Sequence, residues 1–411
     1  MNILVLNAGS GSQKCSLFQV NAELPDEPME PIWKASIEST FPHQVADELL
    51  LEVEHHGQKD KEQILSPTIS RTERIEKLVA DLWTRRPAIL PGPESIDIVG
   101  HRVVHGGAVF HEATRLNQDV EAAIKRLSAF APLHNPSNLE GIQIMRHLLG
   151  DNVPQVAVFD TSFHQTLPEA AAVYPGPYDW LQKGIRRYGF HGTSFRWAAA
   201  RAAYLLNRKD DPALRLIICH LGGGCSLAAT VGGQSVDTTM GFTPLDGIAM
   251  CTRSGALDPG ILIYLMRENP DIDGLETMLN KRSGLKGLSG LAGDTRIILP
   301  QMKRGNARAR LAADVFIHRF RAGIGQMLPA LQGPPDAIVF TDAIGEDEPH
   351  IRAQACEPFK FLGLEMDSAK NSENLSDADI SLPTSRIKIL IIKGREDWEI
   401  ARQCHLLAGD Q

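Results

Sequence analysis

The stretch NAGSGSQK, residues 7–14, follows the apolar run MNILVL and has the composition of a turn that binds an anion. In such a turn, backbone N–H groups can point together at a phosphate. A Walker loop would require a helix after the glycines and a GK[ST] ending, and this stretch shows neither. The residues alone leave two interpretations, a phosphate cradle or an ordinary tight turn between strands.

A second motif, GHRVVHGG at residues 100–107, carries two histidines and one arginine. On a helix, His101 and His105 would share a face and suggest a metal pair. The preceding SIDIV and the paired valines favour a strand instead, along which four residues span about 13 Å. We therefore reject a metal pair and retain Arg102 as either a functional or an ordinary surface arginine.

Three loop-like motifs place a histidine beside Asn, Asp, Ser or Thr, namely His134 in FAPLHNPSN, His164 in VFDTSFHQTLP and His191 in YGFHGTSFR. His220 precedes a further Gly-rich turn, and Arg253 lies among small residues in MCTRSGALDPG. Taken singly, each histidine could be structural and the arginine could be a cap or a salt-bridge partner. Together with Gly/Ser turns and acidic residues able to hold Mg²⁺, they favour phosphoryl transfer, which requires positioning and charge neutralisation.

The elements around these motifs predict two α/β domains, since 411 residues exceed one ordinary core. The initial strand–turn–strand pattern recurs at 214–241, which indicates an internal duplication, and residues 336–347 predict a strand ending in a Gly-containing loop. We expect a helix in SRTERIEKLVADLW, where Ser70 and Glu73 form a capping box. Residues 47–67 predict an irregular surface excursion, and the tail predicts a strand, a turn and a helix.

Composition limits the partners of the protein. With 42 Lys+Arg against 50 Asp+Glu, the net charge of −8 disfavours nucleic acid and anionic membranes. No apolar run approaches the roughly 18 residues that span a bilayer, and we find no signal peptide. The six cysteines are scattered without CxxC pairs, which favours a reducing, cytoplasmic location.

Nine blocks resemble, in order, the signature motifs of the acetate kinase family: NAGSGSQK, GHRVVHGG, APLHNPSN, VFDTSFHQT, YGFHGTS, CHLGGGCS, MGFTPLDGIAMCTRSGALDP, SGLKGLSG and FTDAIGED. The resemblance runs from the first strand to the last helix. It implies an α/β fold of two duplicated ribonuclease-H-like (actin-like ATPase) domains with a cleft between them. The implied domains are residues 1–160, completed by 386–411, and residues 161–385, which carry the nucleotide-binding and dimerisation surfaces.

The resemblance also implies roles for particular residues. The first hairpin is expected to bind phosphate and Mg²⁺, with Mn²⁺ as an alternative ion and with Asn7 and Glu396 as the metal-binding residues. The expected catalytic residues are Arg102, Asp160, His191 and Arg253, of which the two arginines grip the carboxylate and the phosphoryl group. A carboxylate acceptor needs no general base, so Asp160 is expected to orient the metal or the arginines.

Two further groups follow from the resemblance. The apolar pocket for the acyl methyl group is expected to consist of Val104, Leu133, Phe190 and Pro244, with Arg102 also binding the substrate. One methylene is worth only about 1–3 kcal/mol in such a pocket, so propionate is expected to be a poorer substrate. The expected nucleotide-binding residues are Ser10, Ser12, Lys14, His220, Gly222, Gly223, Gly224, Asp294, Arg296, Ala343, Gly345 and Asp347. His191 matches the family histidine that stabilises the transition state, and His134 and His220 match two family histidines with a smaller effect on catalysis.

Three departures from the family pattern concern the nucleotide half. HLGGGCS stands for HLGNGSS, so Gly223 replaces an Asn, and KGRED stands for PTNEE, which retains Glu396. FTDAIGED stands for FTAGIGEN, which introduces Asp342, Ala343 and Asp347. A methyl group at Ala343 would strain the backbone if φ is positive there, or would narrow the slot for the purine.

The resemblance thus predicts an enzyme, a phosphotransferase with a carboxyl acceptor. It would transfer the γ-phosphoryl group of ATP to acetate, reversibly and in line, giving acetyl phosphate and ADP. The alternatives are propionate or another short-chain acid as acceptor, GTP or pyrophosphate as donor, and a non-catalytic nucleotide-binding protein of the same fold. The expected partners are these small molecules and a second copy in a homodimer, with no nucleic acid and no membrane.

Overall fold

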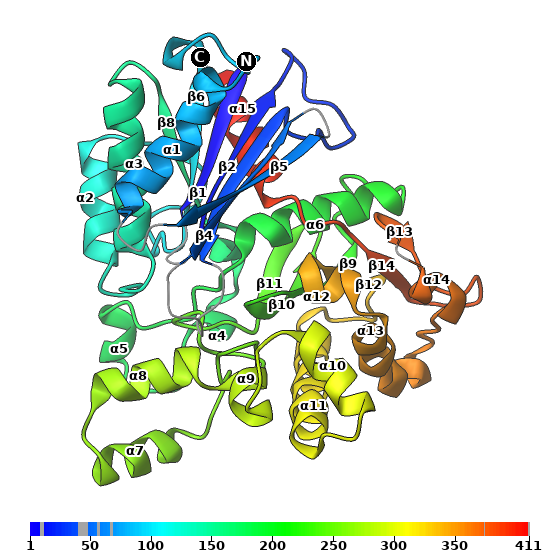
Figure 1. Cartoon of the computed structure of the whole chain (residues 1–411). Helices are drawn as coiled ribbons and strands as arrows, with labels where there is room; N and C mark the ends of the chain where they lie inside the picture. Colours follow the sequence, from blue (N-terminus) through cyan, green and yellow to red (C-terminus); the bar gives the residue numbers. More distant parts are fainter. Residues whose placement is uncertain (9–11, 40–47, 56–57, 66–68, 374, 410–411) are drawn as a thin grey trace. The chain divides into compact units, whose positions relative to one another are not determined.

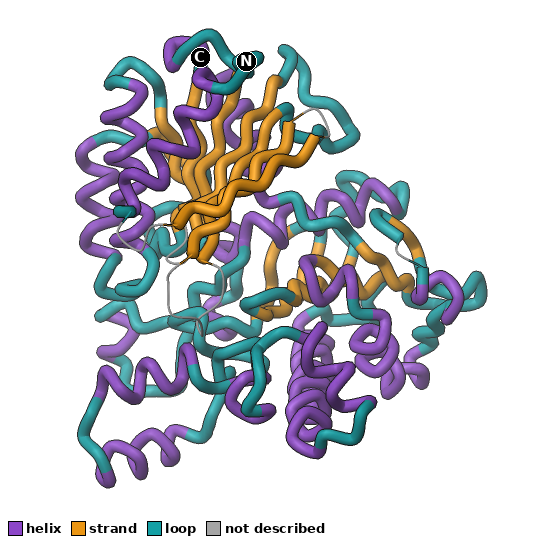
Figure 2. The backbone as a smooth tube through the Cα atoms, viewed as in Figure 1, coloured by secondary structure: helices purple, strands orange, loops and turns teal. Residues whose placement is uncertain are grey.

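The computed structural model describes residues 1–411 except for 9–11, 40–47, 56–57, 66–68, 374 and 410–411 (Figure 1). The chain forms two compact units, and each is built around a sheet of its own with helices packed on it (Figure 2). Unit 1 comprises Met1–Ser162 together with Arg395–Gln411, and unit 2 comprises Phe163–Gly394. Two segments far apart in the sequence therefore complete unit 1.

Unit 1 contains a mixed sheet that has eight strands within the described residues, in the order β5-β4-β3-β2-β1-β6-β8-β7. The strands are β1 (Asn2–Ala8), β2 (Ser12–Gln19), β3 (Trp33–Ser39), β4 (Glu48–His55), β5 (Gln58–Leu65), β6 (Ile98–Val103), β7 (Thr114–Arg115) and β8 (Gln155–Phe159). The helices are α1 (Arg71–Thr84), η1 (Pro93–Ser95), α2 (Gln118–Leu127), α3 (Asn135–Leu149) and α15 (Glu396–Gly409).

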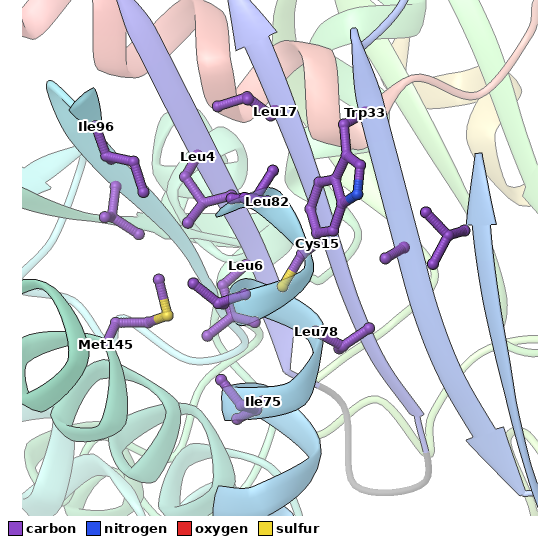
Figure 3. Packing of buried hydrophobic residues seen from close by; sticks show 14 of the residues in the cluster. Leu4, Leu6, Cys15, Leu17, Trp33, Ile75, Leu78, Leu82, Ile96 and Met145 are labelled. Atoms are coloured by element: carbon purple, nitrogen blue, oxygen red, sulfur yellow. The ribbon is translucent and has the colours of Figure 1, made fainter. Parts of the chain in front are cut away.

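Both faces of this sheet are covered, because successive residues of a strand point to opposite sides. One core joins β1–β3 to α1 and α3 and includes Leu4, Leu6, Cys15, Leu17, Trp33, Ile75, Leu78, Leu82 and Met145 (Figure 3). On the opposite face, the ring of Phe18 lies 5.6 Å from the ring of Trp398 in α15. Ser16 donates a hydrogen bond of 2.6 Å from Oγ to Asp397 Oδ2 in the same helix.

The helix expected after residue 70 is confirmed as α1. The Glu73 N–H donates to Ser70 Oγ over 3.2 Å, and the Ser70 N–H donates to Glu73 Oε2 over 2.6 Å. This pair of bonds is the predicted capping box, which satisfies two backbone donors at the helix start. The buried stripe of the helix consists of the predicted Ile75, Leu78, Val79 and Leu82.

The irregular excursion predicted for residues 47–67 is wrong for most of its length, since β4 and β5 form there. The strands pair in antiparallel register, and salt bridges join the facing residues Glu52 with Lys61 and Glu54 with Lys59. Between these charged residues of β4, Leu51 and Val53 point to the other face of the sheet and are buried. The charged outer face of this hairpin explains why its composition resembles that of a loop.

Unit 2 contains a second mixed sheet, whose described residues form six strands in the order β11-β10-β9-β12-β14-β13. The strands are β9 (Arg215–Leu221), β10 (Cys225–Val231), β11 (Gln234–Thr238), β12 (Ala337–Thr341), β13 (Ala378–Asp379) and β14 (Lys388–Ile391). The helices are η2 (Ser162–Thr166), α4 (Glu169–Ala172), α5 (Asp179–Gln182), α6 (Gly192–Leu205), α7 (Pro259–Glu268), α8 (Ile272–Lys281), α9 (Gly284–Ser289), α10 (Thr295–Lys303), α11 (Ala307–Ala330), α12 (Asp342–Asp347), α13 (Pro349–Cys356), η3 (Glu357–Leu362) and α14 (Ser368–Ser372). Across both units, the described residues include no helix that is long and apolar enough to cross a membrane.

The two sheets repeat one topology. The order β3-β2-β1-β6-β8 in unit 1 corresponds to β11-β10-β9-β12-β14 in unit 2. In each case three strands pair antiparallel, and two further strands then add in parallel beside the first strand of the hairpin. The hairpin recurrence predicted from residues 214–241 is therefore confirmed as β9–β11.

The tail divides between the units, which differs from the predicted boundary at residue 386. β14 pairs in parallel with β12, so that Lys388 lies opposite Ala337 in the sheet of unit 2. Only the segment from Arg395, with α15, belongs to unit 1, and the earlier boundary falls after Ser162 instead of residue 160. The strand remains in unit 2 because a parallel partner is available there for its buried backbone groups.

Candidate active site

In unit 1, Arg102 and Asp160 stand at the ends of two neighbouring parallel strands. β6 pairs with β8 so that Arg102 lies opposite Val158, and Asp160 directly follows β8. The carboxyl ends of parallel strands meet at one edge of a sheet, which brings the two side chains together. Arg102 Nε lies 3.0 Å from Asp160 Oδ1, and Arg102 Nη2 lies 2.7 Å from Oδ2. The result is a two-point ion pair.

The carboxylate of Asp160 fixes the orientation of Arg102. The Asp160 side chain is only 1% exposed, whereas the Arg102 side chain is 21% exposed. A carboxylate buried to this degree requires a partner, so the pair holds together while part of the arginine remains accessible. Arg102 Nη1 also lies 3.5 Å from Oδ1 of Asn7, on the neighbouring β1. We call Asn7, Arg102 and Asp160 the arginine site.

The other hairpin residues predicted in unit 1 belong to the same strands or to α15. Lys14 of β2 lies opposite Asn7 in the β1–β2 pairing, and Ser12 begins β2. Glu396 begins α15, which packs against β1 and β6. Ser10 lies outside the described residues. The strand register and helix packing thus place these residues on elements that border the arginine site.

Three other predicted residues of unit 1 lie after β6 or before α3. Val104 lies after β6, and Leu133 and His134 precede α3. The half-buried Val104 directly follows β6, and its N–H donates to Asn138 Oδ1 over 3.1 Å. Leu133 is exposed, and His134 is the N-cap residue of α3. Asn138 therefore ties the first turn of α3 to the chain directly after β6.

Three buried histidines have structural surroundings. His101 Nε2 lies 2.6 Å from Gln155 Oε1, and His164 Nε2 lies 3.0 Å from the Phe190 carbonyl oxygen. Burial lowers the pKa of His101, His105 and His164 to about 4 in each case. All three are therefore neutral at pH 7 and poorly suited to accept a proton there.

His191 and His220 come together in unit 2. Their rings stack with centroids 4.1 Å apart and planes inclined by 29°. His191 Nδ1 lies 2.8 Å from Ser226 Oγ, and His220 Nδ1 lies 2.8 Å from Ser194 Oγ. Each serine hydroxyl thus contacts Nδ1 of its histidine, and the Nε2 atom lies on the other side of the ring. His191 also adopts a positive φ of 58° before α6, a conformation seen at few non-glycine positions.

The Gly222–Gly224 turn joins β9 to β10 and lies beside these rings. A Cβ atom on Gly224 would stand 3.0 Å from His191 Nε2 and 3.4 Å from Arg253 Nη1. Arg253 Nη1 donates to the Pro244 carbonyl oxygen over 3.1 Å, which holds the guanidinium in place. The absence of a side chain at Gly224 therefore lets a histidine and an arginine approach the backbone of the turn.

Two thiols support the turn from the side of Gly222. Cys225 Sγ and Cys251 Sγ donate to the Gly222 carbonyl oxygen over 3.3 and 3.2 Å. Burial raises the pKa of Cys251 to about 11 and raises that of Cys225 well above its ordinary value. Both thiols are therefore protonated at pH 7 and add no negative charge to the turn.

The segment after β12 corrects two expectations. The predicted loop is the short helix α12, and its positive φ of 66° falls at Asp342 and not at Ala343. The strain anticipated at Ala343 therefore does not arise. Aspartate tolerates the left-handed region better than most residues do. Asp342 Oδ2 lies 3.2 Å from His220 Nε2, so we include Asp342 with His191, His220, Gly222–Gly224 and Arg253 in the glycine-turn site.

The remaining residues predicted in unit 2 are more dispersed. Asp294 caps α10 by accepting from the Arg296 N–H, and its carboxylate pairs with the exposed Arg296 guanidinium at 2.7 Å. Gly345 and Asp347 lie in α12. Phe190 is buried, and Pro244 is half-buried beside Arg253.

Sequence reasoning missed three residues that hold these groups. Ser194 and Ser226 orient the two histidines, and both occur inside the quoted motifs, three and six residues after a histidine that drew attention. The buried Arg352 donates to the Gly345 and Glu346 carbonyl oxygens over 2.8 and 2.6 Å and so holds the end of α12. No local pattern distinguishes this arginine, because its partners lie in another helix.

Comparison with known proteins identifies the family. The family model described as acetokinase matches residues 2–402 of the chain. The chain belongs to the acetokinase family. Acetate kinases from Gloeobacter violaceus and Rippkaea orientalis are each 50% identical to this chain, and each alignment covers 98% of both chains. The crystal structure of Porphyromonas gingivalis acetate kinase matches with a TM-score of 0.87 and 34% identity over 99% of each chain.

A propionate kinase from Francisella tularensis also matches, with a TM-score of 0.86 and 34% identity over 98% of each chain. These comparisons confirm three predictions: the family resemblance, the class of duplicated α/β fold, and a phosphotransferase with a carboxyl acceptor. This member of the family is therefore an enzyme, and each of its two units carries part of the predicted residue set.

Proposed function

We propose that this enzyme reversibly transfers the γ-phosphoryl group of ATP to acetate by direct in-line transfer, giving acetyl phosphate and ADP. The observation that carries the proposal is the two-point ion pair between Arg102 and Asp160 beside Asn7. A guanidinium held in one orientation presents a planar set of donors that suits carboxylate and phosphoryl oxygens. This reaction brings those two groups together.

The acceptor requires orientation more than activation. Acetate is ionised at neutral pH, so its oxygen can attack phosphorus without a general base. Both carboxylate oxygens of Asp160 accept hydrogen bonds from Arg102, which suits Asp160 to a positioning role. Arg102 would then offset the repulsion between the acetate and the anionic donor.

The glycine-turn site supplies groups that suit the charge of the transferring phosphoryl. Gly224 of the turn, the Nε2 of His191 and the guanidinium of Arg253 lie close to one another. The Gly222 N–H donates to the Gly224 carbonyl oxygen over 3.0 Å, so the donors that we assign to the phosphoryl group are the N–H groups of Gly223 and Gly224. Phosphoryl transfer passes through a loose, highly anionic transition state, which such donors stabilise. Ser226 holds His191 in the required orientation, and Pro244 holds Arg253.

Mg²⁺ fits this chain as an ion held largely by the substrate. Among the described residues, no group of three or more His, Cys, Asp or Glu side chains could hold a metal. Mg²⁺ commonly takes only one or two protein carboxylates together with phosphates and water, so the residues present suit it. We assign Asn7 and Glu396 as the protein groups that would hold Mg²⁺, or Mn²⁺ in its place. The bound ion would neutralise charge on the phosphates of the donor.

Propionate is a second candidate acceptor, because a relative 34% identical to this chain is named a propionate kinase. We propose Val104, Leu133, Phe190 and Pro244 as the residues that contact the acyl methyl group. A pocket of that kind discriminates one methylene by about 10- to 200-fold. Comparing kcat/KM for the two acids tests this choice, and a higher value for propionate would reverse the assignment.

We also propose that the enzyme is a cytoplasmic homodimer. Helices α7 and α8 follow each other in unit 2 (Figure 1). None of their residues is buried, although both helices carry large apolar side chains such as Ile263, Tyr264 and Ile272. Apolar surface of this extent commonly marks a protein interface, and a second copy is the occupant we assign to it. A monomeric mass in light scattering would contradict the dimer. The six cysteines form no disulfide, which suits a reducing compartment.

The decisive experiment is hydroxylamine trapping of acyl phosphate from the purified enzyme with Mg²⁺, ATP and acetate. We expect a strong signal that falls by at least about 100-fold in Arg253→Ala, because that variant removes a charge from the transition state. Arg304→Ala is the matched control, since Arg304 is an exposed arginine of the same unit. No signal from folded wild-type enzyme with ATP, GTP or pyrophosphate would favour a non-catalytic role instead.

A further inference from the structure

Asp342 carries a negative charge at a turn that is otherwise suited to anions. It directly follows β12 and is fixed in a left-handed conformation with φ of 66°. Its N–H donates to Glu346 Oε1 over 2.9 Å, and the same oxygen accepts from the Gly394 N–H over 2.8 Å. Glu346 is therefore engaged with backbone groups, whereas the Asp342 carboxylate points elsewhere.

The Asp342 carboxylate lies directly against the glycine turn. A Cβ atom on Gly222 would stand only 1.8 Å from Asp342 Oδ2, so the carboxylate occupies the space where a side chain of residue 222 would be. The same oxygen lies 3.2 Å from His220 Nε2. The His220 side chain is 7% exposed and the Asp342 side chain is 42% exposed, so solvent and solutes can reach the carboxylate.

Space for a ligand remains on the next residue of the turn. A Cβ atom on Gly223 would have no neighbour within 4 Å. The groups around the turn that could bind an anion are therefore the N–H groups of Gly223 and Gly224, together with His220, His191 and Arg253. The Gly222 N–H already donates to the Gly224 carbonyl oxygen over 3.0 Å. The two neighbouring thiols are neutral, which leaves Asp342 as the negative charge that contacts the turn among the residues described above.

We propose that Asp342 is an internal anion that competes with the phosphates of the donor for His220 and the glycine turn, and so sets the affinity and the choice of donor. The inference rests on the proposed function in one respect, namely that the donor phosphates use this turn. Two negative charges a few ångströms apart repel each other, and the repulsion is strongest where solvent is partly excluded. When the donor binds, the Asp342 carboxylate must either move away from the turn or remain there and repel the donor phosphates.

Two other roles for Asp342 make different predictions. If the carboxylate only orients His220, removing its charge while keeping its shape would leave the affinity for anions unchanged. If it holds a cation that accompanies the donor, removing the charge would weaken binding in the presence of Mg²⁺. The competing-anion role alone predicts tighter binding of phosphate ligands both with and without Mg²⁺.

The test is calorimetric titration of the full-length protein with ADP and with pyrophosphate, with and without Mg²⁺. Asp342→Asn keeps the shape of the side chain and tolerates the positive φ while removing the charge. We expect binding about tenfold tighter for both ligands, with the larger gain for pyrophosphate, which carries more charge close to phosphorus. Asp342→Gly should show the same direction, which guards against a misfolded Asn variant.

Glu357→Gln is the matched control for loss of one negative charge, because Glu357 lies in unit 2 on η3 and pairs with an exposed lysine. Its binding constants should equal those of the wild type. Unchanged or weaker binding in Asp342→Asn would overturn the inference. If the wild type forms acyl phosphate but Asp342→Asn binds the ligands no more tightly, the inference is wrong and the proposed function stands. If Asp342→Asn binds them more tightly but the wild type forms no acyl phosphate, the inference stands and the proposed function is wrong.

Discussion

The arginine site and the glycine-turn site are built in different ways. The arginine site stands on the ends of adjacent parallel strands, and its charges are paired, since Asp160 is buried against Arg102. The glycine-turn site stands on connections between elements and includes two non-glycine residues with positive φ, His191 and Asp342. In the glycine-turn site, the Asp342 carboxylate lies beside His220 and the turn, which could themselves bind an anion.

This difference indicates which part of the enzyme can vary. A charge pair on two strands of one sheet tolerates little change, because removing one partner leaves a buried charge uncompensated. A turn made of glycines and loop residues can accept substitutions that adjust its charge. Two of the departures from the family pattern, at Gly223 and Asp342, lie at or against the glycine turn, which agrees with this contrast.

The largest effect is expected from Asp160→Asn, which would break the arginine site. The substitution removes the charge that fixes Arg102, and a misplacement of about 1 Å can cost about 100-fold in rate. We therefore expect kcat/KM for acetate to fall by at least about 100-fold in steady-state assays. Asp81→Asn is the control, since Asp81 also pairs with an arginine of unit 1, Arg85, at 2.9 Å. Near wild-type kcat/KM in Asp160→Asn would show that Arg102 needs no such support.

A smaller effect is expected from Gly224→Ala, which would test whether close approach matters in the glycine-turn site. The added methyl group would press on His191 and Arg253 at 3.0 and 3.4 Å. We expect kcat to fall about tenfold through displacement of these two groups. Gly325→Ala in α11 is the control, because its Cβ atom would meet no neighbour within 4 Å. Equal activities of both variants would argue against a role for His191 and Arg253 at this turn.

The smallest expected effect is on the stability of the folded protein at acidic pH, to which buried histidines of the two units contribute differently. Burial lowers the pKa of His101, His105 and His164 to about 4, so the unfolded chain binds protons near pH 6 that the folded chain does not. Their contribution to stability is present above about pH 6.5 and is lost as the pH falls from there toward 4. Two of the three, His101 and His105, lie in unit 1, so we expect this histidine contribution to be larger there.

Thermal unfolding measured from pH 7 to pH 4.5 checks this expectation. His101→Gln should flatten the decline of Tm with falling pH, since glutamine does not titrate. His111→Gln is the control, because His111 is exposed. The same pH dependence of Tm in wild type and His101→Gln would mean that other groups dominate acid unfolding.

Some elements could be predicted because their signals are local. The capping box of Ser70 and Glu73 and the stripe that follows it lie within one helix, and both were predicted. The β4–β5 hairpin was missed because its charges resemble those of a loop until the two strands pair, with Glu54 facing Lys59. The boundary in the tail was predicted too early, at residue 386, because the partner of the tail strand, β12, lies far away in the sequence.

By itself, the sequence determined the family, the two hairpin-led sheets and the residue types available for phosphoryl transfer, since these depend on motifs of a few residues each. Tertiary structure decided which of the expected partners Asp160 holds, namely Arg102 across 58 residues, and that the positive φ belongs to Asp342. The reason is physical: a motif contains its own hydrogen-bonding groups, but which distant group satisfies each buried charge depends on the order of strands in the sheet.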